Sequence, residues 1–172
     1  MEKINLKQLT YVGKGAHGKV YRLDKNRCIK ICKNTKDMQM EYRVLKRAER
    51  YPQFPKVYQC KGKYMIREYV DGQNIVDYIK KNGFSNNLAR ELTELIKVFI
   101  KLKFTRIDIR MSEVFVTRDN KIKIIDTTRY LDKKASYPIK MLTVLEELGY
   151  KRRYNDFLKK YYLEFYRKWN KW

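Results

Sequence analysis

The sequence has little of several residue types, and each shortage excludes a class of protein. It contains three cysteines and one histidine among 172 residues, and none of them has the spacing of a zinc site. Cys28 and Cys32 lie too close along one expected strand for a disulfide framework, so we expect a reducing, cytoplasmic location. No apolar run approaches the roughly 18 residues that span a bilayer, and the start, MEKINLKQLT, has no apolar signal core. The sequence therefore predicts neither a secreted nor a membrane-spanning protein.

Acidic residues are also scarce. The chain has 19 aspartates and glutamates against 41 lysines and arginines, which gives a net charge of +22. Such an excess attracts nucleic acid, anionic lipid, acidic proteins or nucleotide phosphates. The charges are scattered, however, and a solvated lysine-rich surface without a dedicated partner explains them slightly better. With 44% hydrophobic residues, the chain has the composition of a soluble globular protein of one domain or two small lobes.

The first third of the chain is expected to form short strands and one helix. The glycine-rich segment GKGAHGK separates LKQLTYV from VYRL, and DKNR turns the chain into CIKIC. Two further strands, KVYQC and KYMIREYV, meet at a hairpin turn at Gly62. From Thr35 to the residues before Pro52 the period is helical, with one face formed by Met38, Glu41, Leu45 and Ala48. Glu41 therefore lies on a face that is otherwise apolar.

Beyond Asp71-Gly72 the pattern becomes mainly helical. Helices are expected over residues 74–81, 86–103, 138–148 and 152–168, and VFVT and KIKIID are expected to form a hairpin turned at Asp119-Asn120. These patterns predict an α+β protein with two parts, residues 1–70 and residues 71–172.

An aromatic stripe with basic residues between its members marks the last expected helix. Its members are Tyr150, Tyr154, Phe157, Tyr161, Phe165 and Trp169. A basic amphipathic helix of this kind can bind membrane or nucleic acid. Core packing with basic side chains in solvent is the commoner arrangement, and we favour it here.

The flanks of the glycine segment indicate what it binds. Gly13-x-Gly15-x-x-Gly18 alone is weak evidence, because dinucleotide sites use similar turns. A dinucleotide site needs a helix after the glycines, whereas here a second strand follows and then a lysine-bearing third strand. A glycine-rich hairpin of this kind covers nucleotide phosphates with its backbone N–H groups. Lys30, in CIKIC, and Glu41 are expected to pair, because each would be costly to bury alone.

In this order the segments resemble the protein kinase-like superfamily, over roughly residues 8–130. GKGAHGKVY is similar to the glycine-rich loop, CIK to the end of the phosphate-binding lysine strand, and YMIREYVDG to the hinge that holds adenine. IDIRMSEVFV resembles the catalytic loop and IID the metal-binding aspartate motif, and Glu41 stands where the partner of the lysine is expected. The resemblance implies a bilobal kinase-like fold, with a small antiparallel-sheet lobe with one helix and a reduced, mainly helical C-terminal lobe.

The resemblance also implies a role for each site residue. Asp108 would accept the proton of the substrate hydroxyl, and Arg110 would steady the transferring phosphoryl group. Lys30, paired with Glu41, would bind the α- and β-phosphates of ATP. Asp126 would hold Mg²⁺, with Mn²⁺ as an alternative. The nucleotide would lie against Gly13, Gly15, Gly18, Val20 and Cys28, with its adenine edge on the backbone of Glu68 and Val70.

The chain departs from the kinase pattern at several positions. Glu113 replaces the asparagine that binds a second metal ion, and is expected to join Asp126 as a ligand. Arg106-Ile107 replaces the usual His-Arg, and Thr127-Thr128 replaces Phe-Gly. Arg67 stands behind the adenine, where apolar or small residues are usual. After Asp126, 46 residues remain, and they contain no Ala-Pro-Glu motif. In this respect the sequence resembles a minimal bacterial kinase.

Three functional hypotheses follow. The leading one is an ATP-dependent serine/threonine protein kinase acting on an unidentified protein hydroxyl, and a kinase-like small-molecule phosphotransferase stays open beside it. The second is a pseudokinase that binds nucleotide or a partner without turnover, which Glu113 and Thr127-Thr128 motivate. The third is association with nucleic acid or an acidic partner through the basic surface, which is compatible with either of the others.

Overall fold

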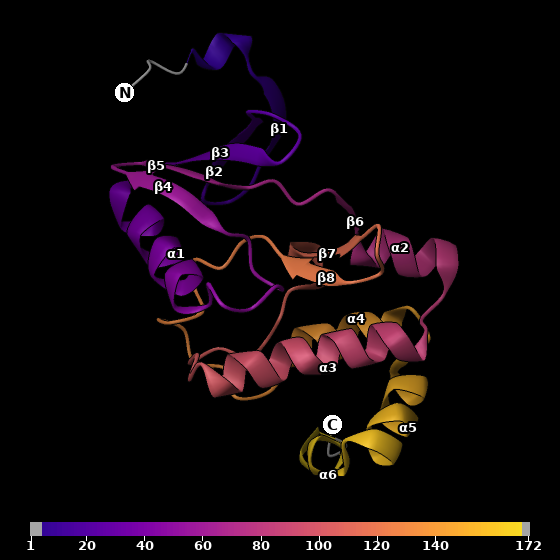
Figure 1. Ribbon diagram of the computed structural model, residues 1–172. Coiled ribbons are helices and arrows are strands. Elements are labelled where there is room, and N and C mark those ends of the chain that lie inside the picture. The colour runs from indigo at the N-terminus through magenta and orange to yellow at the C-terminus, as the bar shows by residue number, and fades with distance from the viewer. Residues whose placement is uncertain (1–4, 170–172) are drawn as a thin grey trace.

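An antiparallel sheet of five strands forms the N-terminal part of the structure, a computed structural model that describes residues 5–169 (Figure 1). The spatial order of the strands is β1-β2-β3-β5-β4. Their bounds are β1 (Thr10–Lys14), β2 (Gly18–Arg22), β3 (Arg27–Cys32), β4 (Val57–Lys61) and β5 (Tyr64–Glu68). The strand expected over LKQLTYV begins only at Thr10, because Leu6–Gln8 form a 3-10 helix, η1, that the side chain of Asn5 caps. The hairpin turn at Gly62 is confirmed, with φ +57°.

Helix α1 (Thr35–Arg47) packs against β3, β4 and β5. The Asn34 side chain caps its first turn by accepting a hydrogen bond from the backbone N–H of Asp37. The expected apolar face is buried, and Glu41 is fully buried with it, at 0% exposure. The helical period of the sequence therefore placed this carboxylate correctly, facing the central strand β3.

A second, three-stranded antiparallel sheet follows, in the order β6-β7-β8. Its strands are β6 (Gly72–Asn74), β7 (Val114–Thr117) and β8 (Ile122–Ile124). The predicted β7-β8 hairpin is confirmed, and Asn120 takes the positive φ of its turn, +57°. Figure 1 shows this small sheet between the five-stranded sheet and the helices.

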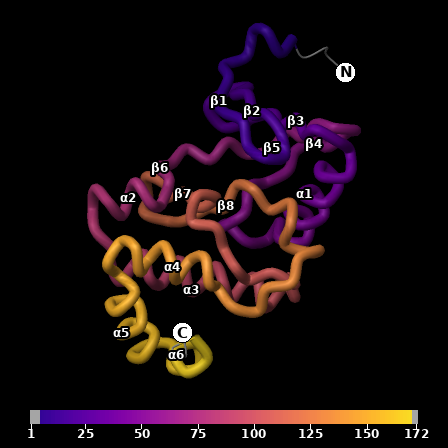
Figure 2. The backbone as a smooth tube through the Cα atoms, turned by 180° about the vertical axis from the view of Figure 1, so that it is seen from behind, coloured from indigo at the N-terminus to yellow at the C-terminus, as the bar shows by residue number. Residues whose placement is uncertain are grey.

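The remaining elements are mainly helical. They are α2 (Ile75–Asn82), α3 (Asn86–Lys101), the 3-10 helix η2 (Met111–Glu113), α4 (Ile139–Glu147), α5 (Lys151–Tyr161) and α6 (Leu163–Trp169). Figure 2 shows from behind that α3 and α4 lie beneath the small sheet and that α5 and α6 lie farthest from the five-stranded sheet. An antiparallel sheet with one helix, followed by helices, is the α+β arrangement that the sequence predicted.

The prediction of a single helix over residues 152–168 is wrong, because the helix is interrupted at Tyr162. This residue has φ −144° and ψ 58°, outside the helical region. Its hydroxyl donates to Glu94 Oε1 on α3 at 2.8 Å, and Lys97 Nζ lies 5.4 Å from the centre of its ring. These contacts hold Tyr162 against α3 and divide the segment into α5 and α6.

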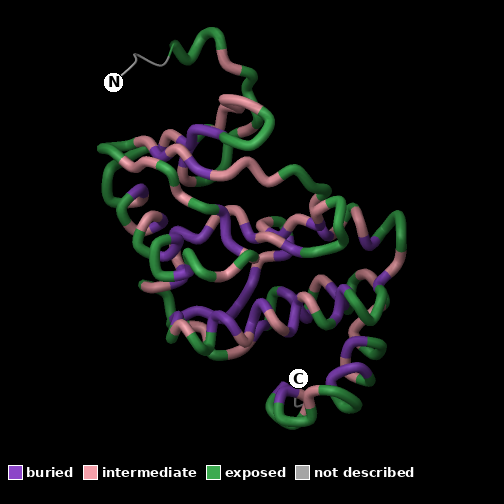
Figure 3. The backbone as a smooth tube through the Cα atoms, viewed as in Figure 1, coloured by how far each residue is buried: buried purple, intermediate pink, exposed green. Residues whose placement is uncertain are grey.

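The aromatic stripe of this C-terminal segment mostly packs inside the protein (Figure 3). Tyr154, Phe157, Phe165 and Trp169 are buried, while Tyr161 is 48% exposed. The favoured interpretation, core packing, thus fits the structure. The four buried members of the stripe are not accessible for stacking on nucleic-acid bases. No helix among residues 5–169 is both long and apolar enough to cross a membrane.

Candidate functional site

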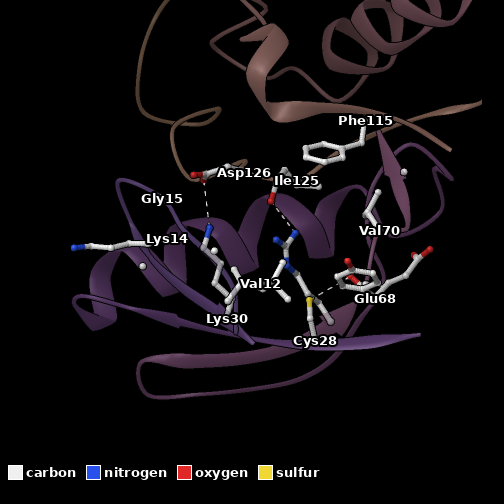
Figure 4. Close-up of a pocket in the computed structure, with 16 residues that line it drawn as sticks. Val12, Lys14, Gly15, Cys28, Lys30, Glu68, Val70, Phe115, Ile125 and Asp126 are labelled. Atoms are coloured by element: carbon white, nitrogen blue, oxygen red, sulfur yellow. Dashed lines mark hydrogen bonds and ion pairs between the residues drawn. The ribbon is translucent and has the colours of Figure 1, made fainter. Parts of the chain in front are cut away.

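A cavity of about 330 Å³ lies between the five-stranded sheet and the small sheet (Figure 4). The residues expected to contact the nucleotide all line it: Gly13, Gly15, Gly18, Val20, Cys28, Lys30, Glu68 and Val70. Asp126, the expected metal ligand, lines it as well. Figure 4 shows Lys30 rising from the sheet toward Asp126, with Phe115 and Ile125 on the same side as Asp126. Segments far apart in the sequence thus meet around one hollow.

The other expected site residues do not line this cavity. Glu41 contacts Lys30 from helix α1, and Glu113 lies close enough to Asp126 for the charge of Asp126 to act on it. Arg110 borders a separate hollow on the α4 side, together with Ser112, Lys140 and Thr143. Asp108 is buried, at 7% exposure, and its carboxylate contacts the start of α4. The candidate site therefore consists of one cavity and a neighbouring group of side chains beneath it.

The three glycines of the loop differ in what the fold requires of them. A Cβ at Gly18 would lie 2.1 Å from the carbonyl oxygen of Ile31 on β3, so strand packing alone requires glycine there. A Cβ at Gly13 would meet nothing within 4 Å, and one at Gly15 would reach only Asp126 Oδ2, at 3.9 Å. Packing does not explain these two glycines, whereas close approach of a ligand to the backbone does.

Lys30 lies between two carboxylates. Its Nζ donates to Glu41 Oε2 at 2.5 Å and to Asp126 Oδ1 at 3.4 Å. Burial alone would lower the pKa of the ammonium group, but Glu41 and Asp126 together raise it above its ordinary value. The expected Lys30–Glu41 contact is present, and Lys30 is held as a cation at the edge of the cavity.

Asp126 is held in its ionised form. Burial would raise the pKa of its carboxyl group, but the charge of Lys30 and the hydroxyl of Thr128 bring it below the ordinary value. Thr128 Oγ1 lies 3.0 Å from Asp126 Oδ1 and 3.3 Å from Glu41 Oε2. An ionised carboxylate oxygen facing a cavity is the type of ligand that Mg²⁺ prefers.

The β7-β8 register brings Glu113 beside Asp126. Val114 pairs with Ile124, and in the next position the N–H of Ile125 donates to the carbonyl of Glu113 at 2.9 Å. Glu113 Oε1 accepts from Arg110 at 3.3 Å and Oε2 accepts from Tyr130 at 3.1 Å. Burial, and then the charge of Asp126, raise the pKa of the Glu113 carboxyl group.

Within residues 5–169 no group of three or more His, Cys, Asp or Glu side chains is arranged to hold a metal ion. Magnesium, however, commonly uses one or two carboxylates and completes its shell with phosphate and water oxygens. Asp126 supplies one such carboxylate at the cavity, whereas both oxygens of Glu113, the other expected ligand, already accept hydrogen bonds from Arg110 and Tyr130. The donor chemistry is therefore suitable for a metal ion that arrives with a nucleotide.

Replacing Glu113 with glutamine is expected to stabilise the folded protein at neutral pH. The folded protein holds the proton of Glu113 more tightly than the unfolded chain does, because the pKa of this carboxyl group is raised in the folded state. The folded protein therefore loses stability as the pH rises from the unfolded-state pKa, about 4.3, through the folded-state pKa. Thermal unfolding should show Glu113→Gln melting a few degrees above the wild type at pH 7, with the difference shrinking at about pH 4. Glu147→Gln, on the exposed side of α4, is the matched control. Equal melting temperatures at pH 7 would contradict the destabilisation assigned to the ionised Glu113 carboxylate.

Asp108 supplies a missing cap for α4. Pro138, at the N-cap position, makes no side-chain hydrogen bond, and the backbone N–H of Lys140 donates instead to Asp108 Oδ1 at 2.8 Å. This contact gives Asp108 a structural role that the sequence did not predict. A capping carboxylate can also act in chemistry, since its second oxygen is not engaged by this contact.

Two substitutions separate the structural role of Asp108 from a chemical one. Asp108→Ala removes the acceptor and is expected to cost about 1 kcal/mol, or roughly 2 to 4 °C in melting temperature. Asp108→Asn keeps an acceptor oxygen, so its melting temperature is expected to match the wild type. If Asp108 is also a catalytic base, both variants lose phosphate transfer, and only the alanine variant loses stability. If the asparagine variant has full activity, Asp108 has only the capping role.

Several residues around the cavity were not assigned roles by the sequence. Phe115 lines it because β7 alternates, so that Val114 and Val116 face the core and Phe115 faces the other side. That period-two pattern was a readable signal. Thr128 and Tyr130 reach Asp126 and Glu113 through hydroxyl contacts, for which the sequence carries no such signal.

His17, inside the glycine segment, pairs with α1. Its Nδ1 lies 3.0 Å from Asp37 Oδ2, and the hydrogen bond from His17 lowers the pKa of the Asp37 carboxyl group. The backbone N–H of Lys33 also donates to the carbonyl of His17 at 3.0 Å. These contacts give the histidine a structural role, which ties the glycine segment to the helix that carries Glu41.

Comparison with known families agrees with this arrangement. Residues 32–155, well over half of the chain, match the ABC1 atypical kinase-like domain. The matched range includes Glu41, Asp108, Glu113 and Asp126, whereas the glycine segment and Lys30 precede it. No match is found among the curated proteins. The placement of the glycines and Lys30 at the cavity thus depends on the geometry described above.

Proposed function

We propose a function from the premise that this chain belongs to the ABC1 atypical kinase-like domain family. Membership in that family implies a kinase-like fold and a kinase-like function with ATP binding. The more specific proposal is that the protein transfers the γ-phosphate of ATP to a protein hydroxyl, as a serine/threonine kinase does. Membership in the family does not identify the class of molecule that accepts the phosphate.

One observation carries the proposal: a buried lysine lies between two carboxylates under a glycine-rich hairpin. Lys30 contacts Glu41 and Asp126, and Gly15 lies over Asp126 Oδ2. Phosphoryl transfer needs mainly positioning and positive charge around a loose transition state. A fixed ammonium and an ionised carboxylate beneath a glycine-rich hairpin are parts that such a reaction uses.

The apolar part of the cavity suits a purine base. Val20 and Cys28 lie on the sheet side and Phe115 on the other, so a flat ring can lie between them. The carbonyl of Glu68 accepts the weak S–H donor of Cys28, at 3.6 Å. We therefore assign the base edge to the backbone of Glu68 and Val70, as the kinase resemblance suggests.

Asp126 would hold Mg²⁺ or Mn²⁺, with Glu113 as the second carboxylate. When bound, the metal ion neutralises charge on the phosphates. Lys30 would orient the α- and β-phosphates. Asp108 would take the proton of the acceptor hydroxyl through the oxygen not bonded to Lys140. Arg110 and Lys140, which border the hollow on the α4 side, supply positive charge where the acceptor would approach.

The direct test is transfer of a labelled γ-phosphate from ATP, with Mg²⁺ and with Mn²⁺. Acceptors should include the protein itself, a general protein substrate and a small-molecule hydroxyl panel. The proposal expects metal-dependent label on serine or threonine. Label found only on small molecules would support a phosphotransferase and reject a protein acceptor. If ATP is not turned over with any metal ion, the hypothesis that the protein is an enzyme is rejected.

A second candidate is a nucleotide-binding pseudokinase. Three contacts favour it: Asp108 already accepts from the Lys140 amide, and Glu113 already accepts from Arg110 and from Tyr130. It expects thermal stabilisation by ATP without any phosphate transfer. Stabilisation by neither nucleotide nor metal would reject both candidates.

A further inference from the structure

A buried arginine near the end of strand β5 lines the cavity. Arg67 is 4% exposed, and β5 alternates so that Met65 and Arg67 face inward together. A charged group in the centre of a sheet is costly unless it is paired and hydrogen-bonded. The contacts of Arg67 must therefore offset that cost.

Arg67 joins three separate elements. Its Nη1 donates to the carbonyl oxygen of Ile125 at 2.7 Å, the contact drawn to Ile125 in Figure 4. The same nitrogen lies 3.8 Å from Glu41 Oε1 on α1. The guanidinium therefore connects β5 with the residue before Asp126 and with the helix that carries Glu41.

The peptide of Ile125 is consequently held from both sides. Its carbonyl accepts from Arg67, and its N–H donates to the carbonyl of Glu113. Asp126 follows directly, so these two bonds fix the backbone from which its carboxylate points toward Lys30. Thr127, the residue after Asp126, is fully buried but its hydroxyl has no partner, whereas the hydroxyl of Thr128 bonds the Asp126 carboxylate itself rather than its backbone.

We propose that Arg67 is a positioning residue that holds Asp126 facing Lys30 before any nucleotide binds. The segment from residue 127 to residue 138, before α4, is short, so the site needs an internal tether. Arg67 also remains beside Glu41 when Lys30 turns toward a phosphate, and so keeps that buried carboxylate paired with a cation. The use of this tether in metal and nucleotide binding rests on the proposed function, but the tether itself does not.

Hydrogen exchange of the full-length protein without nucleotide tests the tether. Arg67→Met, which fills similar space, is expected to speed exchange of the Ile125 amide, which is bonded to Glu113, by about tenfold or more, the equivalent of one lost charged hydrogen bond. Amides in β3 and α1 should keep their rates. Arg67→Lys should recover part of the protection. Arg43→Met, on the exposed side of α1, is the matched control and should change nothing.

Nucleotide affinity tests what the tether serves. In the wild type, Mg²⁺ is expected to tighten ATP binding, and Arg67→Met should reduce the ratio of the affinities with and without Mg²⁺ about tenfold. A loss of packing alone would speed exchange across β5 and α1 as well and leave the ratio unchanged.

Each outcome decides one part of the proposal. Unchanged exchange of the Ile125 amide would overturn the tether, and faster exchange with an unchanged effect of Mg²⁺ on ATP affinity would overturn its role in the site. If Arg67→Met does not fold, Arg67→Gln, which keeps a donor for Ile125, and Arg67→Lys are compared by the same measurements. A wild type that binds no ATP would reject the proposed function, and the exchange rates would still decide the tether.

Discussion

Replacing Asp126 with asparagine is expected to reduce metal-dependent phosphate transfer by about 10³-fold or more. Asparagine has nearly the same shape and keeps an oxygen that can accept from Thr128. It lacks the negative charge that holds a metal ion and that faces Lys30 across 3.4 Å. The fold should survive, because Lys30 keeps its shorter contact with Glu41. The loss is therefore expected in turnover and metal dependence rather than in melting temperature.

The measurement is the rate of labelled phosphate transfer over a range of Mg²⁺ and Mn²⁺ concentrations. Asp132→Asn is the matched control, because Asp132 belongs to the same segment but pairs with Arg129 at the surface. The control should keep full activity. If Asp126→Asn transfers phosphate at the wild-type rate, the assignment of Asp126 to the metal is wrong.

Replacing Lys30 with methionine is expected to remove both activity and much of the stability. Glu41 is fully buried, and without Lys30 its nearest cation is Arg67, at 3.8 Å. Breaking a buried ion pair by removing one partner costs about 3 to 5 kcal/mol. The melting temperature should then fall by roughly 10 °C.

The double variant Lys30→Met with Glu41→Met separates the two effects. Replacing both members of a buried pair by apolar groups of similar size is often nearly neutral, so the stability should return close to that of the wild type. Phosphate transfer should stay absent, because the phosphate-binding cation is still missing. Denaturant unfolding of the wild type, Lys30→Met, Glu41→Met and the double variant gives the coupling energy. A double variant no more stable than Lys30→Met alone would argue against a coupled pair.

The sequence predicted those parts of the site that local patterns determine. The helical period placed Glu41 on the buried face of α1, and the short link from β3 to α1 brought it to Lys30. Alternation and turn residues located the β7-β8 hairpin, whose register then sets Glu113 beside Ile125. In each case a short stretch of chain contains the information.

The sequence could not predict contacts between distant segments. The capping of α4 by Asp108 joins residues 32 positions apart, and the Arg67 contact with Ile125 joins residues 58 apart. The break at Tyr162 arises from a hydroxyl contact with Glu94 on another helix, which outweighs a good local helical pattern. Each of these side chains has several possible hydrogen-bond partners, and tertiary packing selects one of them. Local sequence patterns do not show which partner is selected.

The contact between Lys30 and Asp126 spans 96 positions, and this has a consequence for synthesis on the ribosome. The N-terminal sheet and α1 leave the ribosome first and can bring Lys30, Glu41 and Arg67 together while the hairpin is still unmade. Until residue 126 emerges, that cluster holds two cations and one carboxylate. The arriving aspartate balances the cluster, so closure of a loop this long is favoured by charge as well as by packing. A nascent chain that stops before the hairpin should therefore present an anion-binding surface that the finished protein covers with its own carboxylate.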